Sequence, residues 1–132
     1  MKRVLFICTH NAGRSQMAEA FLRHLARGAV KAESAGTMPS ERVNPVVVEV
    51  MRERGIDISR NRPKLLTPEM AERADRVVTM GCSAEKMCPA AFVPSEDWAL
   101  EDPEGKPIEE VRQIRDEIEA RVKRLLSELK LP

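Results

Sequence analysis

The sequence predicts an α/β fold, a small four-stranded parallel sheet with helices on both faces. Short apolar runs bounded by charged or turn-forming residues alternate along the chain with segments of helical periodicity. Alternating strands and helices are joined by right-handed crossovers, which produce parallel strands covered by helices. Apolar residues make up 42% of the 132 residues, enough for one core. We therefore expect a single domain spanning residues 1–132.

The first half of the chain contains two predicted strands and two predicted helices. Residues 3–8, RVLFIC, form an apolar run typical of a strand buried on both faces. Residues 15–27 carry apolar side chains at helical spacing, and Gly28 follows as a stop signal. A second strand is predicted at 29–37. The Asn-Pro pair that opens segment 44–54 indicates a helix start, although the valines behind it would alone suggest a strand.

The second half is predicted to contain two helices and two strands. A Thr-Pro pair starts a short helix at 67–73, and DRVVTM at 75–80 is a buried strand. The remaining segments are a loop or helical turn at 81–88, a fourth strand at 90–94, a turn-rich connection at 96–107 and a C-terminal helix at 108–129. In sheets of this kind ligands bind outside the carboxyl ends of the strands. Cys8, Cys82 and the loop containing Asp102 all follow strand ends, so we expect them at one edge.

Composition excludes several classes of protein. Lys and Arg number 22 against 21 Asp and Glu, so no nucleic-acid-binding surface is indicated. No apolar run approaches the roughly 20 residues of a membrane span, and the short apolar N-terminus lacks a signal-peptide cleavage site. The three cysteines are an odd number, which argues against a secreted disulfide framework. We expect a cytoplasmic monomer with no metal site.

The loop between the first strand and the first helix has the composition of an anion site. Backbone N–H groups at such a junction, together with the positive end of the helix dipole, bind anions. Gly13 is expected to permit unusual backbone angles, and Arg14 can grip two oxygens of a tetrahedral oxyanion. The same field favours the thiolate of Cys8, to which Ser15 can donate. His10 is expected to point away from the nucleophile. The predicted substrate-binding residues are Thr9, His10, Asn11, Ala12, Gly13, Arg14 and Ser15.

The C-x5-R-S pattern from Cys8 to Ser15, together with SAG at 34–36 and DP at 102–103, carries a family resemblance. Over essentially the whole chain the sequence resembles the low-molecular-weight protein tyrosine phosphatases. The resemblance implies a single catalytic domain in which Cys8 is the nucleophile, Arg14 binds the transferred group and Asp102 is the general acid.

The segment VTMGCSAEKMCP resembles the arsenate reductases built on the same fold, which carry a redox cysteine pair in a GC…CP pattern. That resemblance implies attack of Cys8 on arsenate, a Cys8–Cys82 disulfide as arsenite leaves, and then a Cys82–Cys88 disulfide. Thioredoxin or a low-molecular-weight thiol would supply the reducing equivalents, with no tightly bound cofactor. On an intact helix the two Cα atoms would be roughly 9 Å apart, beyond the ~7 Å of a disulfide. We therefore expect residues 81–94 to be mobile.

Three alternatives remain open. The first is a tyrosine phosphatase, although the chain has no Tyr and no aromatic residue directly follows Asp102 and Pro103. The second is that Cys82 and Cys88 are structural thiols or half of a zinc site. The third is a module that binds an oxyanion without turnover. Because Cys8, Arg14 and Asp102 suffice for phosphate ester hydrolysis, a reductase is also expected to retain weak phosphatase activity.

Overall fold

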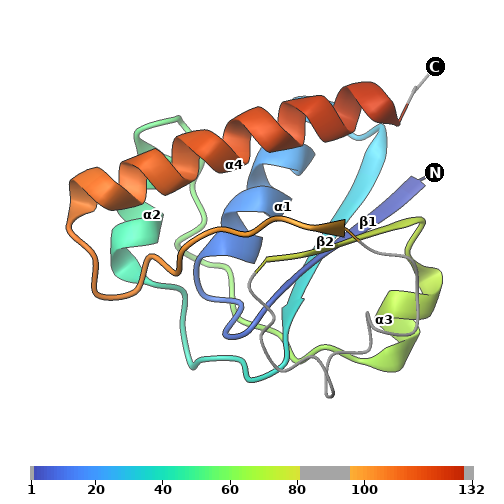
Figure 1. The fold of residues 1–132 in the computed structure, drawn as a ribbon, viewed down its shortest axis with the longest axis horizontal. Coiled ribbons are helices and arrows are strands. Elements are labelled where there is room, and N and C mark those ends of the chain that lie inside the picture. Colours follow the sequence, from blue (N-terminus) through green and yellow to red (C-terminus); the bar gives the residue numbers. More distant parts are fainter. Residues whose placement is uncertain (1, 81–95, 130–132) are drawn as a thin grey trace.

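The computed structural model describes residues 2–80 and 96–129. Within these residues the sheet has four strands, in the spatial order β2-β1-β3-β4 (Figure 1). The strands are β1 (Lys2–Cys8), β2 (Val30–Gly36), β3 (Arg76–Thr79) and β4 (Glu96–Asp97). Every neighbouring pair is parallel. The predicted four-stranded parallel sheet is therefore confirmed, and β1 lies inside it with a partner on each side.

The position of the fourth strand differs from the sequence prediction. β4 has two residues and lies at the start of 96–107, where the sequence predicts a turn-rich connection. The strand predicted at 90–94 lies outside the described residues. Glu96 and Asp97 have no apolar pattern that would predict a strand. Their strand conformation comes from pairing with Val78 and Thr79 on β3. Ion pairing of Glu96 with Arg76 adds to that edge. Pairing of this kind leaves no trace in local periodicity.

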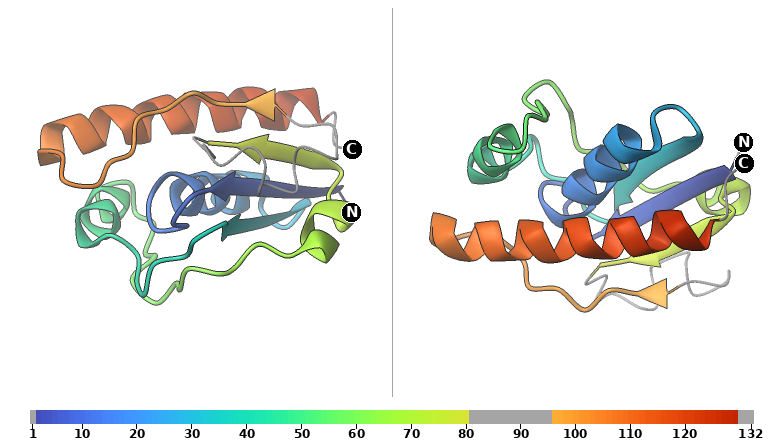
Figure 2. Two further views of the ribbon diagram at one scale, coloured as in Figure 1. Left: turned by 60° about the horizontal axis from the view of Figure 1, so that its bottom comes forward. Right: turned by 90° about the horizontal axis from the view of Figure 1, so that it is seen from above.

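Helices cover both faces of the sheet, as predicted. The helices are α1 (Arg14–Ala26), α2 (Pro45–Arg52), α3 (Pro68–Arg73) and α4 (Ile108–Glu128). α1 and α4 lie side by side over one face, and α3 lies on the other (Figure 2). Alternate β1 residues face the two sides, with Phe6 and Cys8 in the larger core and Leu5 and Ile7 in the smaller one. No helix of the described residues is both long and apolar enough to cross a membrane.

The two proline-started helices begin where the sequence predicts. The Asn44 side chain accepts a hydrogen bond from the Val46 amide at 2.9 Å, and the Thr67 hydroxyl accepts one from the Met70 amide at 3.3 Å. These caps satisfy backbone donors that the first helical turn leaves unpaired. At α2 the cap and proline therefore prevail over the strand preference of its valines.

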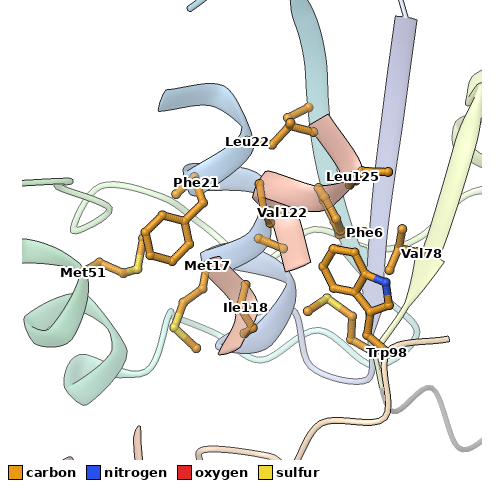
Figure 3. Packing of buried hydrophobic residues seen from close by; sticks show 14 of the residues in the cluster. Phe6, Met17, Phe21, Leu22, Met51, Val78, Trp98, Ile118, Val122 and Leu125 are labelled. Atoms are coloured by element: carbon orange, nitrogen blue, oxygen red, sulfur yellow. The ribbon is translucent and has the colours of Figure 1, made fainter. Parts of the chain in front are cut away.

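Trp98 belongs to the larger core. Its ring lies against Phe6, with centroids 5.7 Å apart and planes tilted by 51° (Figure 3). The side chain is buried, and its indole nitrogen Nε1 donates a hydrogen bond to Glu96 Oε2 at 3.3 Å. Figure 3 also shows Val78 of β3 beside this pair. Trp98 therefore anchors the chain that leaves β4 to the sheet, just before the loop that contains Asp102.

A charged cluster joins the C-terminus of α2 to α4. The buried Arg115 guanidinium donates to the Val50 carbonyl at 3.0 Å and to Glu53 Oε1 at 2.6 Å. Arg112 donates to the same carboxylate, with its Nη2 2.8 Å from Oε2. Hydrogen bonds from Arg112 and Arg115 lower the pKa of Glu53 from 4.5 to about 2.

This cluster predicts a specific acid sensitivity. A lowered carboxyl pKa stabilises the folded state fully above the unfolded value of 4.5, and that stabilisation is lost as the pH falls towards 2. The variant Glu53→Gln should therefore have a lower free energy of unfolding than wild type at pH 7. The difference in free energy between the two proteins should shrink between pH 5 and about pH 3. Urea denaturation at a series of pH values measures both quantities. Glu72→Gln, at an exposed site on α3, is the matched control, and a pH-independent difference for Glu53→Gln would contradict the assignment.

Candidate active site

Strand β1 and helix α1 meet at a loop that closes the floor of a cavity. β1 ends at Cys8 and α1 begins at Arg14. The cavity, about 490 Å³, is lined by this loop, by residues 40–45 and by residues 102–105. It therefore has room for an oxyanion together with part of a larger substrate or an attacking thiol. The sequence expectation that Cys8 and the Asp102 loop lie at one edge of the sheet agrees with this arrangement, whereas Cys82 and Cys88 lie outside the described residues.

Cys8 lies at the bottom of the cavity, with only 2% of its surface exposed. Its sulfur accepts a hydrogen bond from the Asn11 backbone amide at 3.2 Å and lies 2.8 Å from the Ser15 hydroxyl. Two such contacts on a thiol sulfur suit the thiolate, since an anion accepts hydrogen bonds more strongly than a neutral thiol.

The carbonyl groups of the loop are occupied by the segment that follows β2. The carbonyls of Cys8, Thr9, His10 and Ala12 accept from the amides of residues 37, 38, 40 and 44, at 2.8–3.3 Å. In a trans peptide the N–H points opposite to the C=O, so the next residue's amide in each case faces the other way. The Asn11 amide does so and meets the sulfur. Segment 37–44 thus orients the anion loop, a contribution that our sequence analysis missed.

Two contacts of the anion loop are possible only because the residue at the contact is a glycine. A Cβ on Gly36 would lie 2.7 Å from the Thr9 carbonyl oxygen and 2.9 Å from the Asn11 amide nitrogen, so the loop rests directly on β2. A Cβ on Gly13 would lie 2.7 Å from Pro103 Cγ. Gly13 has φ −143° and ψ −89°, which belong to neither a helix nor a strand, so its backbone angles are unusual as expected; the left-handed residue of the loop is Asn11, with φ 51°. The missing side chain of Gly13 also allows the 102–105 loop to approach.

Arg14 is held between the anion loop and the segment that follows β4. Its side chain is buried, and Nη1 donates to the Leu100 carbonyl at 3.0 Å. Nη2 lies 3.7 Å from Oδ2 of Asp102, whose side chain is 46% exposed at the cavity wall. Asp102 Oδ1 accepts from the Glu104 amide at 3.0 Å, which fixes the carboxyl group. Arg14 and Asp102 therefore lie next to each other in the wall of the cavity that contains Cys8.

His10 lines the cavity, as the predicted substrate-binding set requires, and its ring lies near the 102–105 loop. Its Nδ1 lies 3.0 Å from the Met38 carbonyl oxygen, which can only accept, so Nδ1 carries the hydrogen. A ring nitrogen of His10 and the carboxylates of Asp102 and Glu104 lie within 4.8 Å of one another. Among the described residues this is the group that could share a cation, but the Arg14 guanidinium beside Asp102 opposes one. His24 is exposed on α1.

Residues 3–131 match the family model described as low molecular weight phosphotyrosine protein phosphatase. The chain belongs to this family. A putative arsenate reductase of Halobacterium salinarum is 44% identical over 128 residues, covering 93% of this chain and 89% of that protein. The structure of a thioredoxin-dependent arsenate reductase of Corynebacterium glutamicum is 41% identical with a TM-score of 0.83, covering 98% of this chain and 62% of the other. The resemblance predicted from the sequence is therefore confirmed.

Phosphatases of the family have the same architecture. An arginine phosphatase from Geobacillus stearothermophilus is 31% identical, with a TM-score of 0.86, and covers 98% of this chain and 94% of the other. Proteins with this fold thus carry out more than one reaction, so the fold alone does not identify the reaction of this chain.

The close approach at Gly36 predicts a site-specific defect. Gly36→Ala would push the Thr9 and Asn11 backbone away from β2 and so displace the amide that faces the Cys8 sulfur. Misplacement of about 1 Å costs on the order of 10²-fold in rate, so turnover and phosphate affinity should both fall. Kinetics and phosphate titration measure these losses. Gly28→Ala is the control, since its Cβ meets nothing within 4 Å and its positive φ of 88° affects stability alone. Equal activity of the two variants would contradict the prediction.

Proposed function

We propose that this protein reduces arsenate to arsenite with Cys8 as the nucleophile and Cys82 and Cys88 as the redox pair. The observation that carries the proposal is the site around Cys8, in a chain that also carries two further cysteines in a GC…CP pattern. The relatives named as arsenate reductases support it. Thiol exchange explains why cysteines outside the anion loop are needed, whereas ester hydrolysis does not use them.

Binding of the oxyanion uses groups that are already in place. The loop carbonyls are turned towards segment 37–44, which leaves loop amides facing the other way, and Arg14 lines the same cavity as Cys8; both kinds of donor attract a tetrahedral anion. The loop residues 9–15 therefore form the substrate-binding site in this proposal. Because these donors are held by backbone and carbonyl contacts, little rearrangement accompanies binding.

In the first step the Cys8 thiolate attacks arsenic, so an As–S bond forms and one As–O bond breaks. The departing oxygen leaves as water after taking a proton, and we assign its donation to Asp102, which lines the same cavity as Cys8. Cys82 then attacks Cys8 Sγ. An S–S bond forms, the As–S bond breaks, and its electron pair stays on arsenic, which reduces As(V) to As(III).

The remaining steps regenerate the thiols. Cys88 attacks Cys82, which releases the Cys8 thiolate and leaves a Cys82–Cys88 disulfide. A dithiol protein of the thioredoxin class reduces that bridge, in line with the name of the Corynebacterium relative. The two electrons that reach arsenic are thus supplied in the end by the external dithiol.

Phosphate ester hydrolysis is the second candidate function, and one observation favours it. Cys8, Arg14 and Asp102 line one cavity in an arrangement that suffices for phosphoryl transfer through a cysteinyl intermediate. The side chains after Asp102 and Pro103 are Glu104, Gly105 and Lys106, so this loop offers no aromatic ring to a tyrosine substrate. We therefore propose that phosphatase activity is a weak side reaction.

A cysteine series distinguishes the two functions. Cys82→Ser should abolish arsenite formation with thioredoxin and thioredoxin reductase, because the arsenic adduct on Cys8 is no longer attacked. The same variant should keep the wild-type rate on p-nitrophenyl phosphate, a reaction that does not use Cys82. Cys8→Ser is the matched control and should lose both activities, by about 10⁴-fold or more.

Disulfide mapping by mass spectrometry during arsenate turnover completes this test. Wild type should accumulate the Cys82–Cys88 bridge, and Cys88→Ser should trap the Cys8–Cys82 bridge. Unchanged arsenite formation in Cys82→Ser would overturn the proposed cascade. Absence of arsenite formation in wild type, together with rapid aromatic phosphate turnover, would establish the phosphatase instead.

A further inference from the structure

Reduction of arsenate consumes protons, whereas hydrolysis of a phosphate ester does not. Hydrogen arsenate and a dithiol give arsenous acid, a disulfide and water only by taking up two further protons from solution. A phosphate monoester and water give an alcohol and hydrogen phosphate without net uptake, because the acid that protonates the leaving oxygen regains a proton from the attacking water. The cavity of a reductase therefore needs a route that brings protons from solution to the bound oxyanion.

His10 is held at the cavity in one orientation. Its carbonyl accepts from the Ser40 amide at 3.0 Å, and its ring Nδ1 donates to the Met38 carbonyl at 3.0 Å. These two bonds fix the residue to segment 37–44. Because Nδ1 keeps its hydrogen for Met38, the ring gains and loses a proton at Nε2. The residue is half-buried in the wall of an open cavity, so solvent reaches it.

The imidazole lies within reach of the group assigned as the acid. A ring nitrogen of His10 and carboxylate oxygens of Asp102 and Glu104 lie within 4.8 Å of one another. One water bridges a separation of this size, since each hydrogen bond spans about 2.8 Å. Asp102 in turn lines the same cavity as Cys8. A proton on His10 thus has a short path to the site of the reaction.

His10 differs from the other charged or titratable residues that line the cavity. Among side-chain types, histidine exchanges protons most readily near neutral pH. The carboxylates of the 102–105 loop attract an imidazolium, whereas the guanidinium groups at the cavity oppose it. The groups of both signs are Cys8, Arg14, Glu41, Arg42, Asp102 and Glu104.

We propose that His10 relays protons from solution to Asp102 during arsenate reduction. The Nε2 proton passes to the Asp102 carboxylate, and Asp102 passes it to the oxygen that departs from arsenic. The neutral imidazole then takes another proton from solution, so the relay moves protons and no electrons. This inference rests on the proposed function, because hydrolysis makes no such demand for protons.

The test compares two rates of each protein. These are arsenite formation, with thioredoxin and thioredoxin reductase in excess, and hydrolysis of phenyl phosphate. His10→Asn keeps a side-chain N–H for the Met38 carbonyl but has no proton to exchange. A general acid contributes about 10²- to 10⁴-fold, and a group that only resupplies it contributes less. His10→Asn should therefore lower arsenite formation about tenfold more than it lowers hydrolysis.

The other histidine of the chain supplies the matched control. His24 is exposed on α1, so His24→Asn should leave both rates at the wild-type value. His10→Ala also removes the contact with Met38, and the additional loss should affect both rates equally. If His10→Asn does not fold, His10→Gln replaces it in the comparison.

Chemical rescue identifies the missing proton as the cause. In dilute buffer, added imidazole should restore most of the arsenite formation of His10→Asn, and sodium chloride at the same ionic strength should restore none. A purely structural role of His10 would lower both rates together, leave their ratio at the wild-type value and give no response to imidazole. That result would overturn the proposal.

The outcomes separate this inference from the proposed function. A wild-type protein that forms no arsenite would refute the reductase, and with it the demand for protons that His10 is proposed to meet. Arsenite formation by wild type, together with an unchanged ratio of the two rates in His10→Asn, would refute the role of His10 alone.

Discussion

The site depends on hydrogen-bond donation to one buried sulfur. Cys8 Sγ receives the Asn11 amide and lies against the Ser15 hydroxyl at the end of the central strand. Neither donor is free to turn away, because segment 37–44 occupies the loop carbonyls and Asn11 is held by Lys64. A rigid set of donors favours the negatively charged sulfur, and the same set binds an oxyanion above it. Nucleophile and substrate site thus share one electrostatic origin.

Much of this arrangement follows from local sequence signals. The apolar run of β1, the caps at Asn44 and Thr67, and the Cys8-to-Ser15 pattern predict the sheet, two helix starts and the anion loop. The parts that escaped prediction depend on contacts between distant segments. β4 forms by pairing with β3, Gly13 is required by Pro103, and the loop carbonyls are occupied by residues nearly thirty positions away or more. Glu19 has an ordinary helical position in the sequence, and only the fold places it beside Ser34.

The same scaffold supports reduction and hydrolysis because both begin with attack by a thiolate on a tetrahedral oxyanion. Phosphorus in a cysteinyl intermediate is released by water, whereas arsenic accepts an electron pair when a second thiol attacks the first. The difference between the reactions therefore lies in whether a second thiol reaches Cys8. The contact of Arg14 with the Leu100 carbonyl joins the oxyanion site to the chain that follows β4.

The state of the Cys8 sulfur in the wild-type protein tests the account most directly. Site-resolved alkylation at neutral pH should modify Cys8 faster than a cysteine in an unstructured peptide, and the rate should fall when arsenate or phosphate is added. A Cys8 that reacts no faster than the peptide cysteine and whose rate ignores both oxyanions would contradict the account.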